Sequence, residues 1–378
     1  MKIIHAFLLG LTAVSALNAD AAPAPNRPII VGYIYSRESP LPPDAIDAIR
    51  LDRINYAFVR IKDGRITTGC AADPQNFALL NALKKQNPSL TILVSVGGWL
   101  GSRGFSDAAL SAQSRKVFIL SAVEFLRQYN LDGLDVDWEY PGSKGAGNRH
   151  RVEDKQNFTL LLKELRSAFD AEAAKSHKLL YLTIAAGASD EFLANTQMEA
   201  VARVVDTVNL MTYDYTEPGS DPLTGHNAPL FANPADQRSV SSDASVRAFE
   251  KAGVPAEKIL LGVPFYGHVW GGVAETDHGL FKPGKAVAQG YAPYGRIEEN
   301  FLHQGFVRYW DSASQAPYLY NAATHVFVSY DDPESMEAKG RYAVNHHLGG
   351  VMFWEYMDDP GGKLLGVIRH SLDEPAAR

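Results

Sequence analysis

The sequence has little cysteine, no excess of positive charge and no long apolar run beyond its first residues. Cys70 is the one cysteine among 378 residues, so no disulfide can form within the chain and a cysteine-rich zinc site is excluded. We expect Cys70 to be a small buried hydrophobe. Acidic residues outnumber basic ones by 43 to 36, and the net charge of −7 argues against binding to nucleic acid or to an anionic membrane, though not to a neutral polymer. With 46% hydrophobic and 21% charged residues, the composition is typical of a globular protein.

The first residues resemble a secretory signal. Lys2 precedes an apolar run at 6–17, and small residues at 19–21 form an A-x-A-like cleavage site. The apolar run is shorter than the about 20 residues of a membrane span. We therefore expect residues 1–21 to be removed and the protein to be secreted, either outside the cell or into a periplasm. A buried N-terminal strand is the alternative.

The rest of the chain alternates β-branched runs with longer segments of helical period, which is the pattern of parallel βα units. The predicted strands span 29–33, 53–61, 91–97, 133–139, 179–185, 207–213, 259–266 and 350–355. A helix predicted over 153–174 has one apolar face, and another can begin at Pro333. Eight such strands predict an α/β fold of the (β/α)₈ barrel type, formed by residues 22–267 and 326–378. An open doubly wound sheet is the alternative, but no G-x-G-x-x-G motif follows the first strand.

One connection is far longer than an ordinary barrel loop. No βα unit is evident between 267 and 327, although such connections usually take about 2–6 residues. Residues 268–325 are rich in aromatic side chains. They predict a small α+β subdomain inserted between strands seven and eight, on the face where barrel active sites lie. The aromatic residues either line that site or form only the core of the insertion.

Three carboxylates alternate along the fourth predicted strand, in the segment DGLDVDWE at 132–139. Because successive side chains of a strand face opposite sides, Asp135, Asp137 and Glu139 all point into the barrel. Burial and mutual repulsion raise at least one of their pKa values, and a glutamic acid kept protonated near neutral pH can act as a general acid. Glu139 stands last on the strand, at the expected catalytic mouth.

Other interpretations of these carboxylates are weaker. A solvated acidic edge strand would not carry apolar residues at every alternate position. A calcium loop needs glycine at its sixth position, which here is Tyr140, and we expect neither a metal nor a cofactor. Carboxylates on one strand also do not face each other across a scissile bond, so the nucleophile must come from elsewhere. In substrate-assisted hydrolysis it is the 2-acetamido oxygen of the sugar.

Five short motifs occur in order on the predicted strands. They are SVGGW at 95–99, DGLDVDWE at 132–139, MTYD at 211–214, GVPFYG at 262–267 and GVMFW at 350–354. Together they resemble glycoside hydrolase family 18, the chitinases, over nearly the whole chain after the signal. The resemblance implies a deep-cleft enzyme that hydrolyses β-1,4 linkages between N-acetylglucosamine units with retention, through an oxazolinium ion. It also implies a monomer whose partners are chitin or N-acetylglucosamine oligomers.

The resemblance implies a role for each matching residue. Glu139 matches the acid that protonates the glycosidic oxygen and later activates water. Asp137 matches the residue that orients the acetamido group, and Asp135 matches its buried, proton-sharing partner. Tyr213 matches the hydroxyl that binds the acetamido oxygen. The remaining matches are substrate-binding positions, with Trp354 as the floor under the sugar: Tyr33, Phe58, Ser95, Gly98, Trp99, Tyr140, Met211, Asp214, Tyr266, Met352 and Trp354.

The sequence also departs from the family pattern. His268 stands where many relatives have arginine, Pro218-Gly219 occupies a loop that often carries tryptophan, and Ala185-Ala186-Gly187 replaces a segment that often contains proline. Two alternative functions stay open. One is an endo-β-N-acetylglucosaminidase acting on glycans or peptidoglycan, and the other is a chitin-binding relative without catalysis. The retained Glu139 argues against the second.

Overall fold

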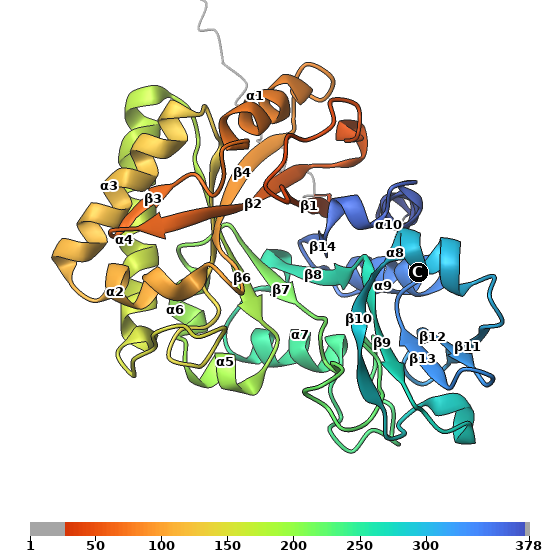
Figure 1. Cartoon of the computed structure of the whole chain (residues 1–378). Helices are drawn as coiled ribbons and strands as arrows, with labels where there is room; N and C mark the ends of the chain where they lie inside the picture. Colours follow the sequence, from red (N-terminus) through yellow and green to blue (C-terminus); the bar gives the residue numbers. More distant parts are fainter. Residues whose placement is uncertain (1–26, 375–378) are drawn as a thin grey trace, which may run out of the picture.

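Eight parallel strands close into a barrel, drawn in Figure 1. The computed structural model describes residues 27–374, so the predicted signal at 1–21 lies outside the described residues. β1 (Ile29–Tyr35) pairs with β2 (Arg53–Lys62) on one side and with β14 (Gly350–Trp354) on the other, which closes the ring. The remaining strands follow in chain order: β4 (Thr91–Gly97), β5 (Gly133–Asp137), β6 (Tyr181–Gly187), β7 (Thr207–Met211) and β8 (Ile259–Pro264). The predicted (β/α)₈ barrel is confirmed.

The fourth barrel strand, β5, ends two residues earlier than the predicted strand at 133–139. β5 stops at Asp137, and the peptide nitrogen of Glu139 binds Ser102 Oγ at 2.9 Å instead of a neighbouring strand. Glu139 therefore lies just beyond the strand, at the carboxyl end of the barrel. This is the face on which barrel enzymes place their sites.

Helices pack around the outside of the barrel. The longer ones are α1 (Asp73–Leu83), α3 (Ala112–Gln128), α4 (Asp154–Ser176), α7 (Ser242–Lys251), α9 (Pro333–Asn345) and α10 (Lys363–Asp373). Shorter helices are α2 (Phe105–Ala109), α5 (Asp190–Ala194) and α6 (Met198–Ala202), and β3 (Arg65–Thr67) forms a hairpin with β2. Helix α9 begins at Pro333 because proline needs no hydrogen bond there, and the Asp332 carboxylate caps the first turn. Across residues 27–374, no helix combines the length and the apolar character needed to cross a membrane.

A second, antiparallel sheet stands beside the barrel, at the lower right in Figure 1. Its strands, in spatial order, are β10 (Lys285–Pro293), β9 (Tyr266–Gly271), β13 (Val326–Ser329), β12 (Ala316–Asn321) and β11 (Val307–Asp311), with the short α8 (Tyr294–Arg296) after β10. The sheet runs from Tyr266 to Ser329 and is thus slightly wider than the predicted insertion at 268–325. Trp270 and Phe327 lie in its own core, whereas Tyr291 reaches the barrel cleft. The aromatic residues of the insertion thus serve both purposes.

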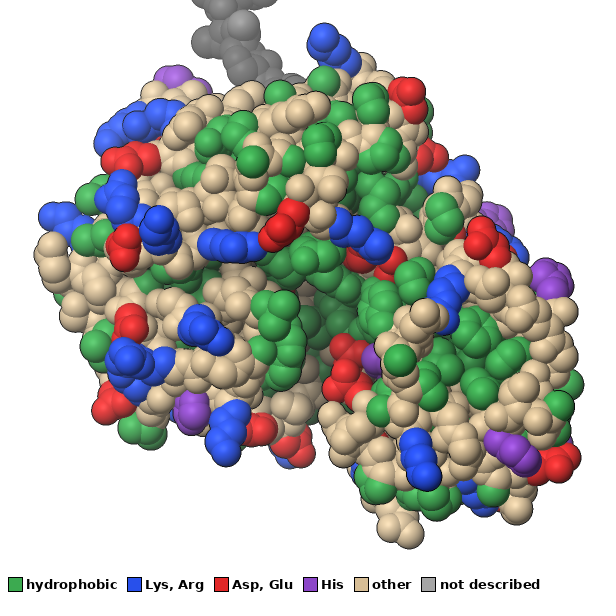
Figure 2. All heavy atoms as spheres, viewed as in Figure 1, with side chains coloured by type: hydrophobic (Ala, Val, Ile, Leu, Met, Phe, Trp, Pro, Cys, Tyr) green, Lys and Arg blue, Asp and Glu red, His purple; other side chains and the backbone are tan. Residues whose placement is uncertain are grey.

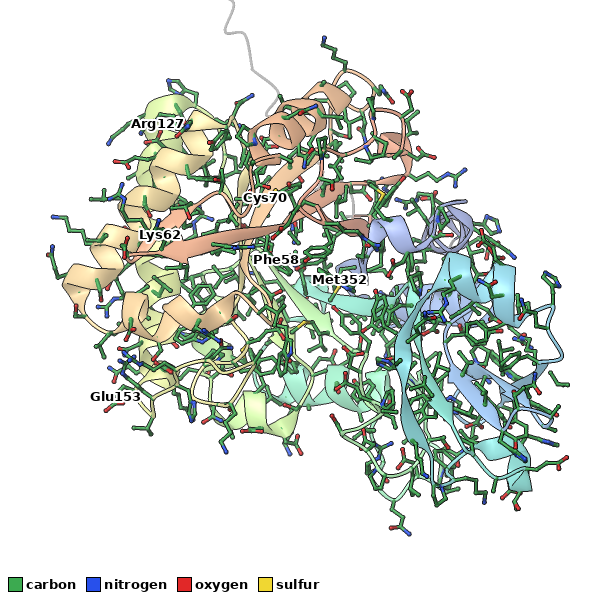
Figure 3. All side chains as sticks on the ribbon, viewed as in Figure 1. Phe58, Lys62, Cys70, Arg127, Glu153 and Met352 are labelled. Carbon is green, nitrogen blue, oxygen red and sulfur yellow. The ribbon has the colours of Figure 1, made fainter. Side chains whose placement is uncertain are left out.

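Cys70 does not behave as a buried hydrophobe. The residue, labelled in Figure 3, is half-buried, and its Sγ donates a hydrogen bond to Asp73 Oδ1 at 3.0 Å. Asp73 Oδ2 also accepts the peptide N–H groups of Gly69 and Cys70. The expectation is wrong because the start of α1 places a carboxylate within reach of the thiol.

Trp138 directly follows β5 and packs against two of the helices that surround the barrel, α2 and α4. Its side chain is 1% exposed and stacks on Phe105 at 5.2 Å between ring centroids, with Phe158 edge-on. We expect Trp138→Ala to lower the free energy of unfolding by about 3–5 kcal/mol in a denaturant titration, because it leaves a large cavity. Trp99→Ala is the matched control, since Trp99 is 52% exposed. Equal losses in the two variants would contradict this packing account.

Candidate active site

A cleft of about 720 Å³ opens at the carboxyl ends of the barrel strands, and the insertion forms part of its wall. Figure 2 shows the hollow, bordered by hydrophobic and acidic side chains. Most of the predicted site residues line it: Tyr33, Phe58, Trp99, Asp137, Glu139, Tyr140, Met211, Tyr213, Asp214, Tyr266 and Trp354. The other four, Asp135, Ser95, Gly98 and Met352, do not line the cleft.

Those four residues lie beneath or behind the lining. Asp135 and Ser95 are fully buried in the barrel interior, and Met352 packs against Tyr33 in a small inner cluster. A Cβ on Gly98 would come within 2.6 Å of the Phe58 ring, so this glycine makes room for an aromatic residue that does line the cleft. We therefore assign these residues supporting positions rather than direct contact with a ligand.

Asp135 is the centre of a buried hydrogen-bond network. Its Oδ2 accepts from Tyr33 Oη at 2.8 Å and from Ser95 Oγ at 2.7 Å. Its Oδ1 accepts from Thr183 Oγ1 at 2.5 Å and from Asn209 Nδ2 at 3.0 Å. Burial raises the pKa of Asp135, while the hydrogen bonds from the three hydroxyls lower it. The four donors favour the charged carboxylate, but burial outweighs them, so the pKa of Asp135 remains above its ordinary value.

Asp137 has the opposite environment. Its side chain is buried, and its Oδ1 has no hydrogen-bond partner among the described residues. Burial raises the pKa of Asp137 well above its ordinary value, and the charges of Glu139 and Asp135 raise it further. With no donor among the described residues to stabilise a negative charge, the neutral form of Asp137 is favoured while no ligand is bound. Asp135 and Asp137 form no direct hydrogen bond in this conformation, because the oxygens of Asp135 already accept from other donors. The proton sharing expected between them stays a prediction.

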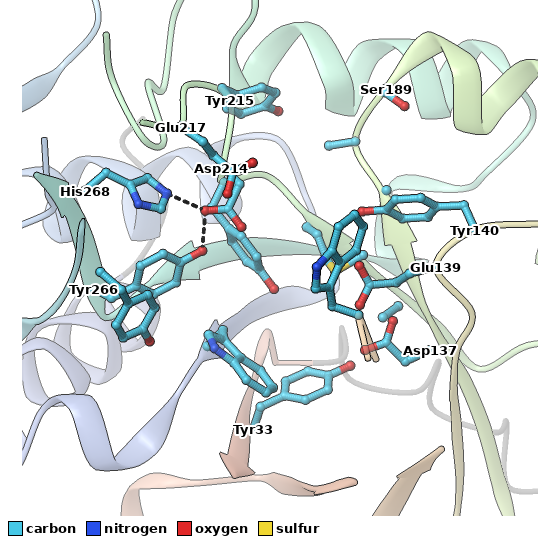
Figure 4. A pocket seen from close by; sticks show the side chains of 18 of the residues that line it. Tyr33, Asp137, Glu139, Tyr140, Ser189, Asp214, Tyr215, Glu217, Tyr266 and His268 are labelled. Carbon is cyan, nitrogen blue, oxygen red and sulfur yellow. Dashed lines mark hydrogen bonds and ion pairs between the residues drawn. The ribbon is translucent and has the colours of Figure 1, made fainter. Parts of the chain in front are cut away.

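Glu139 stands above Asp137 at the wall of the cleft, as Figure 4 shows. Burial raises the pKa of its carboxyl from 4.5 to about 7, with Asp214 adding a like charge and a hydrogen bond from Tyr140 opposing the rise. Its backbone is fixed at both ends, because Ser102 Oγ accepts from the peptide nitrogen and Asn148 Nδ2 donates to the peptide oxygen. A carboxyl held in place with a pKa near neutrality can donate a proton to a bound ligand.

Aromatic rings form the base of the cleft. Trp354 stacks on Phe58 with 5.5 Å between centroids and an interplanar angle of 20°, and Tyr33 lies 5.9 Å away. Trp99 and Tyr140 form a second pair, 6.5 Å apart, and Tyr140 lies near Glu139 in Figure 4. The axial C–H face of a sugar ring packs well on such planes, because aromatic side chains offer a large apolar area in a fixed orientation.

The wall across from Asp137 is polar. Asp214 Oδ1 accepts from Tyr266 Oη at 2.6 Å and lies 2.8 Å from His268 Nε2, interactions drawn as dashed lines in Figure 4. Tyr213 precedes Asp214 and meets Tyr266 edge-on at 6.2 Å. Burial raises the pKa of Tyr213 well above its ordinary value, and Asp137, Asp214 and Glu139 add to the rise. Its hydroxyl therefore stays protonated and can donate a hydrogen bond.

The insertion is tied to the barrel at one edge of the cleft. Tyr291 stacks on Tyr266 at 4.5 Å and donates its hydroxyl proton to Asp358. Arg37 pairs with Asp358 at 2.7 Å and with Glu355 at 2.5 Å. Burial and the neighbouring Glu355 raise the pKa of Asp358 to about 7, although Tyr291 and Arg37 oppose the rise. These contacts join three parts of the chain that are far apart in the sequence.

Sequence reasoning missed several residues of this site. Thr183 and Asn209 could have been found, because each is a polar residue at an inward position of an otherwise apolar strand. Glu217 lines the cleft from an irregular loop and gave no periodic signal. His268 was noted only as a departure. The ligand atoms of Asp214, Glu217 and His268 lie within 4.8 Å of one another, so these residues could also hold a metal ion.

The raised pKa of Glu139 makes a prediction about stability. Folding tightens proton binding at this carboxyl, so its contribution to stability is complete below about pH 4.5 and is lost as the pH rises to about 7. We expect Glu139→Gln to be more stable than the natural chain by about 3 kcal/mol at about pH 8 and equally stable at about pH 4. Thermal unfolding across this range measures the difference. Glu250→Gln, at an exposed position of α7, is the control, and a difference independent of pH would contradict the assignment.

Comparisons with known proteins place the chain among carbohydrate-active enzymes. A family model described as glycosyl hydrolases family 18 matches residues 29–359. Chitinase A1 of Niallia circulans is 43% identical over 79% of this chain, and chitotriosidase-1 of Mus musculus is 32% identical over 88% of this chain and 74% of its own length. A solved family 18 N-acetylglucosaminidase from Paenibacillus barengoltzii is 41% identical, with a TM-score of 0.85 over 91% of this chain and 99% of that one. The present chain spans only 44% of the length of chitinase A1.

Proposed function

Because the chain belongs to glycosyl hydrolase family 18, we propose that it is a secreted glycoside hydrolase that cleaves β-1,4 linkages between N-acetylglucosamine units of chitin and its oligomers. One observation carries the proposal: a buried glutamic acid with a pKa of about 7 stands beside a buried aspartic acid whose pKa is also raised, over an aromatic base. An acid of this kind supplies the proton that a glycosidic oxygen needs when it leaves. We take the enzyme to act as a monomer.

The first step uses the substrate's own acetamide as the nucleophile. Glu139 gives its proton to the glycosidic oxygen, the bond from that oxygen to C1 breaks, and the acetamido oxygen forms a bond to C1. The acetamido N–H supplies the donor that Asp137 lacks in the protein, so Asp137 ionises, accepts this hydrogen bond and stabilises the positive charge of the oxazolinium ion. The Tyr213 hydroxyl, which lines the same cleft, donates to the acetamido oxygen and holds it below C1.

The second step returns the enzyme to its starting state. Glu139, now a carboxylate, takes a proton from water, whose oxygen bonds to C1 while the bond from C1 to the acetamido oxygen breaks. Two displacements at C1 retain its configuration. Asp135 lies two positions before Asp137 on β5, and as its proton-sharing partner it takes up the proton that Asp137 loses on ionising and returns it when the product leaves.

A second candidate activity is release of single N-acetylglucosamine units from chain ends. The 41% identical relative from Paenibacillus barengoltzii is named an N-acetylglucosaminidase, which favours this alternative over a non-catalytic role. A time course of product lengths from chitin hexamer distinguishes the two. Internal cleavage yields dimers to tetramers first, whereas release from an end yields monomer and pentamer first.

The role of Glu139 as the proton donor predicts that replacing its carboxyl group with an amide slows hydrolysis. We expect Glu139→Gln to lower kcat on a chromogenic N-acetylglucosamine oligomer by at least about 10²-fold, because the amide donates no proton to the leaving oxygen. Binding of the same oligomer, measured by calorimetry, should change little, since the amide keeps the shape of the side chain. Turnover near that of the natural chain would remove Glu139 as the acid.

The acetamido oxygen can act as the nucleophile only if the sugar unit that supplies C1 carries an acetamide. Oligomers that carry a free amine in place of the acetamide on the unit contributing C1 should not be cleaved at that unit, because no acetamido oxygen is present to attack. Mass spectrometry of the products from partly deacetylated oligomers identifies the unit at each new reducing end. Frequent glucosamine at that position would show that another group acts as the nucleophile.

A further inference from the structure

Asn227 lies outside the lining of the cleft, yet it contacts two residues of the polar wall. Its side chain is fully buried. Its Oδ1 accepts from the peptide nitrogen of Asp214 at 2.9 Å, and its Nδ2 donates to the peptide oxygen of Tyr266 at 3.2 Å. One amide group therefore sets the spacing between Asp214, on the loop after β7, and Tyr266, at the start of β9.

The same residue holds the turn that follows Tyr213. The backbone of Asp214 adopts a φ of 57°, in the left-handed region that residues other than glycine rarely adopt. The peptide oxygen of Asn227 accepts from the peptide nitrogen of Tyr215 at 3.0 Å, beside the contact between Oδ1 and Asp214. Two successive N–H groups of the turn are thus bound by Asn227, and the turn fixes the direction in which the chain leaves Tyr213.

The position of Asn227 is itself set by the insertion. Its peptide nitrogen donates to Ser329 Oγ, at the end of β13, at 2.6 Å. His226, directly before it, is 4% exposed, and its Nε2 lies 2.9 Å from Asp311 Oδ2 on β11. This short segment therefore joins the insertion sheet to the barrel loop that carries Asp214.

An asparagine suits this place because one planar amide offers both an acceptor and a donor. A leucine of similar size offers neither. When a buried peptide group loses its partner, free energy is lost unless the chain moves to find another. The side chain of Asp214 depends on this spacing as well, because its Oδ1 accepts from Tyr266 Oη at 2.6 Å, as the dashed line in Figure 4 shows.

We propose that Asn227 is a positioning residue for hydrolysis, which acts through the contact between Asp214 and Tyr266 in the wall of the cleft. This inference rests on the proposed function, in which Tyr213, next to Asp214, binds the acetamido oxygen. Asp214, Tyr213 and Tyr266 line the cleft together with Glu139. A sugar held between the acid and a displaced wall is misaligned for proton transfer, and a small misalignment lowers the rate strongly.

A double-mutant cycle tests the inference. Asn227→Leu removes both amide contacts, and Tyr266→Phe removes only the hydroxyl that donates to Asp214. We expect Asn227→Leu to lower kcat/KM on a chromogenic N-acetylglucosamine oligomer by at least about 10-fold and Tyr266→Phe by at least about threefold. The double variant should lose little more than Asn227→Leu alone, because the contact that Tyr266→Phe removes is already disturbed.

A merely structural role of Asn227 gives a different result. The losses of the two single variants would then multiply in the double variant, and this outcome would overturn the inference. An unchanged kcat/KM in either single variant would overturn it too, since the wall contact would not matter to hydrolysis. Failure of the natural chain to hydrolyse the oligomer would instead overturn the proposed function, so the two failures are distinguishable.

Asn76→Leu is the matched control. Asn76 is as deeply buried as Asn227, and its amide is hydrogen-bonded through both its oxygen and its nitrogen, to residues that do not line the cleft. We expect Asn76→Leu to lower the unfolding temperature but to keep kcat/KM within about twofold, and its effect should multiply with that of Tyr266→Phe. All assays are run below the unfolding transition of each variant.

Asn227→Ala takes the place of Asn227→Leu in the cycle if the leucine variant does not fold. The smaller side chain leaves space through which water can reach the two peptide groups that lose the amide. The amide is still absent, so the same loss and the same lack of multiplication with Tyr266→Phe are expected. Losses that multiply in this cycle would overturn the inference equally.

Discussion

The site depends on the cost of burying negative charge. Asp135, Asp137 and Glu139 lie on or just after one strand, and all three side chains are buried. The barrel supplies four donors to the first and none to the second. Because no donor offsets the cost of burial at Asp137 and only Tyr140 does so at Glu139, the pKa values of these two carboxyls are raised. The chemistry at the mouth of the barrel follows from this uneven distribution of hydrogen-bond donors.

The aromatic base and the polar wall line the cleft together with Asp137 and Glu139. Trp354 and Phe58 offer a flat apolar surface that orients a sugar without supplying charge. The insertion contributes Tyr266 and His268, which hold one oxygen of Asp214 and leave the other exposed to the cleft. The barrel therefore supplies the acid, and the insertion completes the surface against which a substrate is positioned.

Much of the fold and the centre of the site could be predicted from sequence, because both depend on regular patterns. Alternation along β5 correctly grouped Asp135, Asp137 and Glu139, although Glu139 lies past the end of the strand. Glu217 could not be predicted, since its position depends on the path of an irregular loop. Cys70 was misjudged for a related reason, because its partner Asp73 meets it only through the turn before α1.

The closure of the barrel has a consequence for the order in which this protein can become active. β14 seals the ring against β1 and also carries Trp354, the base of the cleft, yet of the eight barrel strands it is the last to be synthesised. A nascent chain that has completed β5 and the residues just after it already contains Glu139 but has neither a closed ring nor Trp354. The complete cleft therefore forms only after β14 has been made, and a product terminated before β14 would lack it.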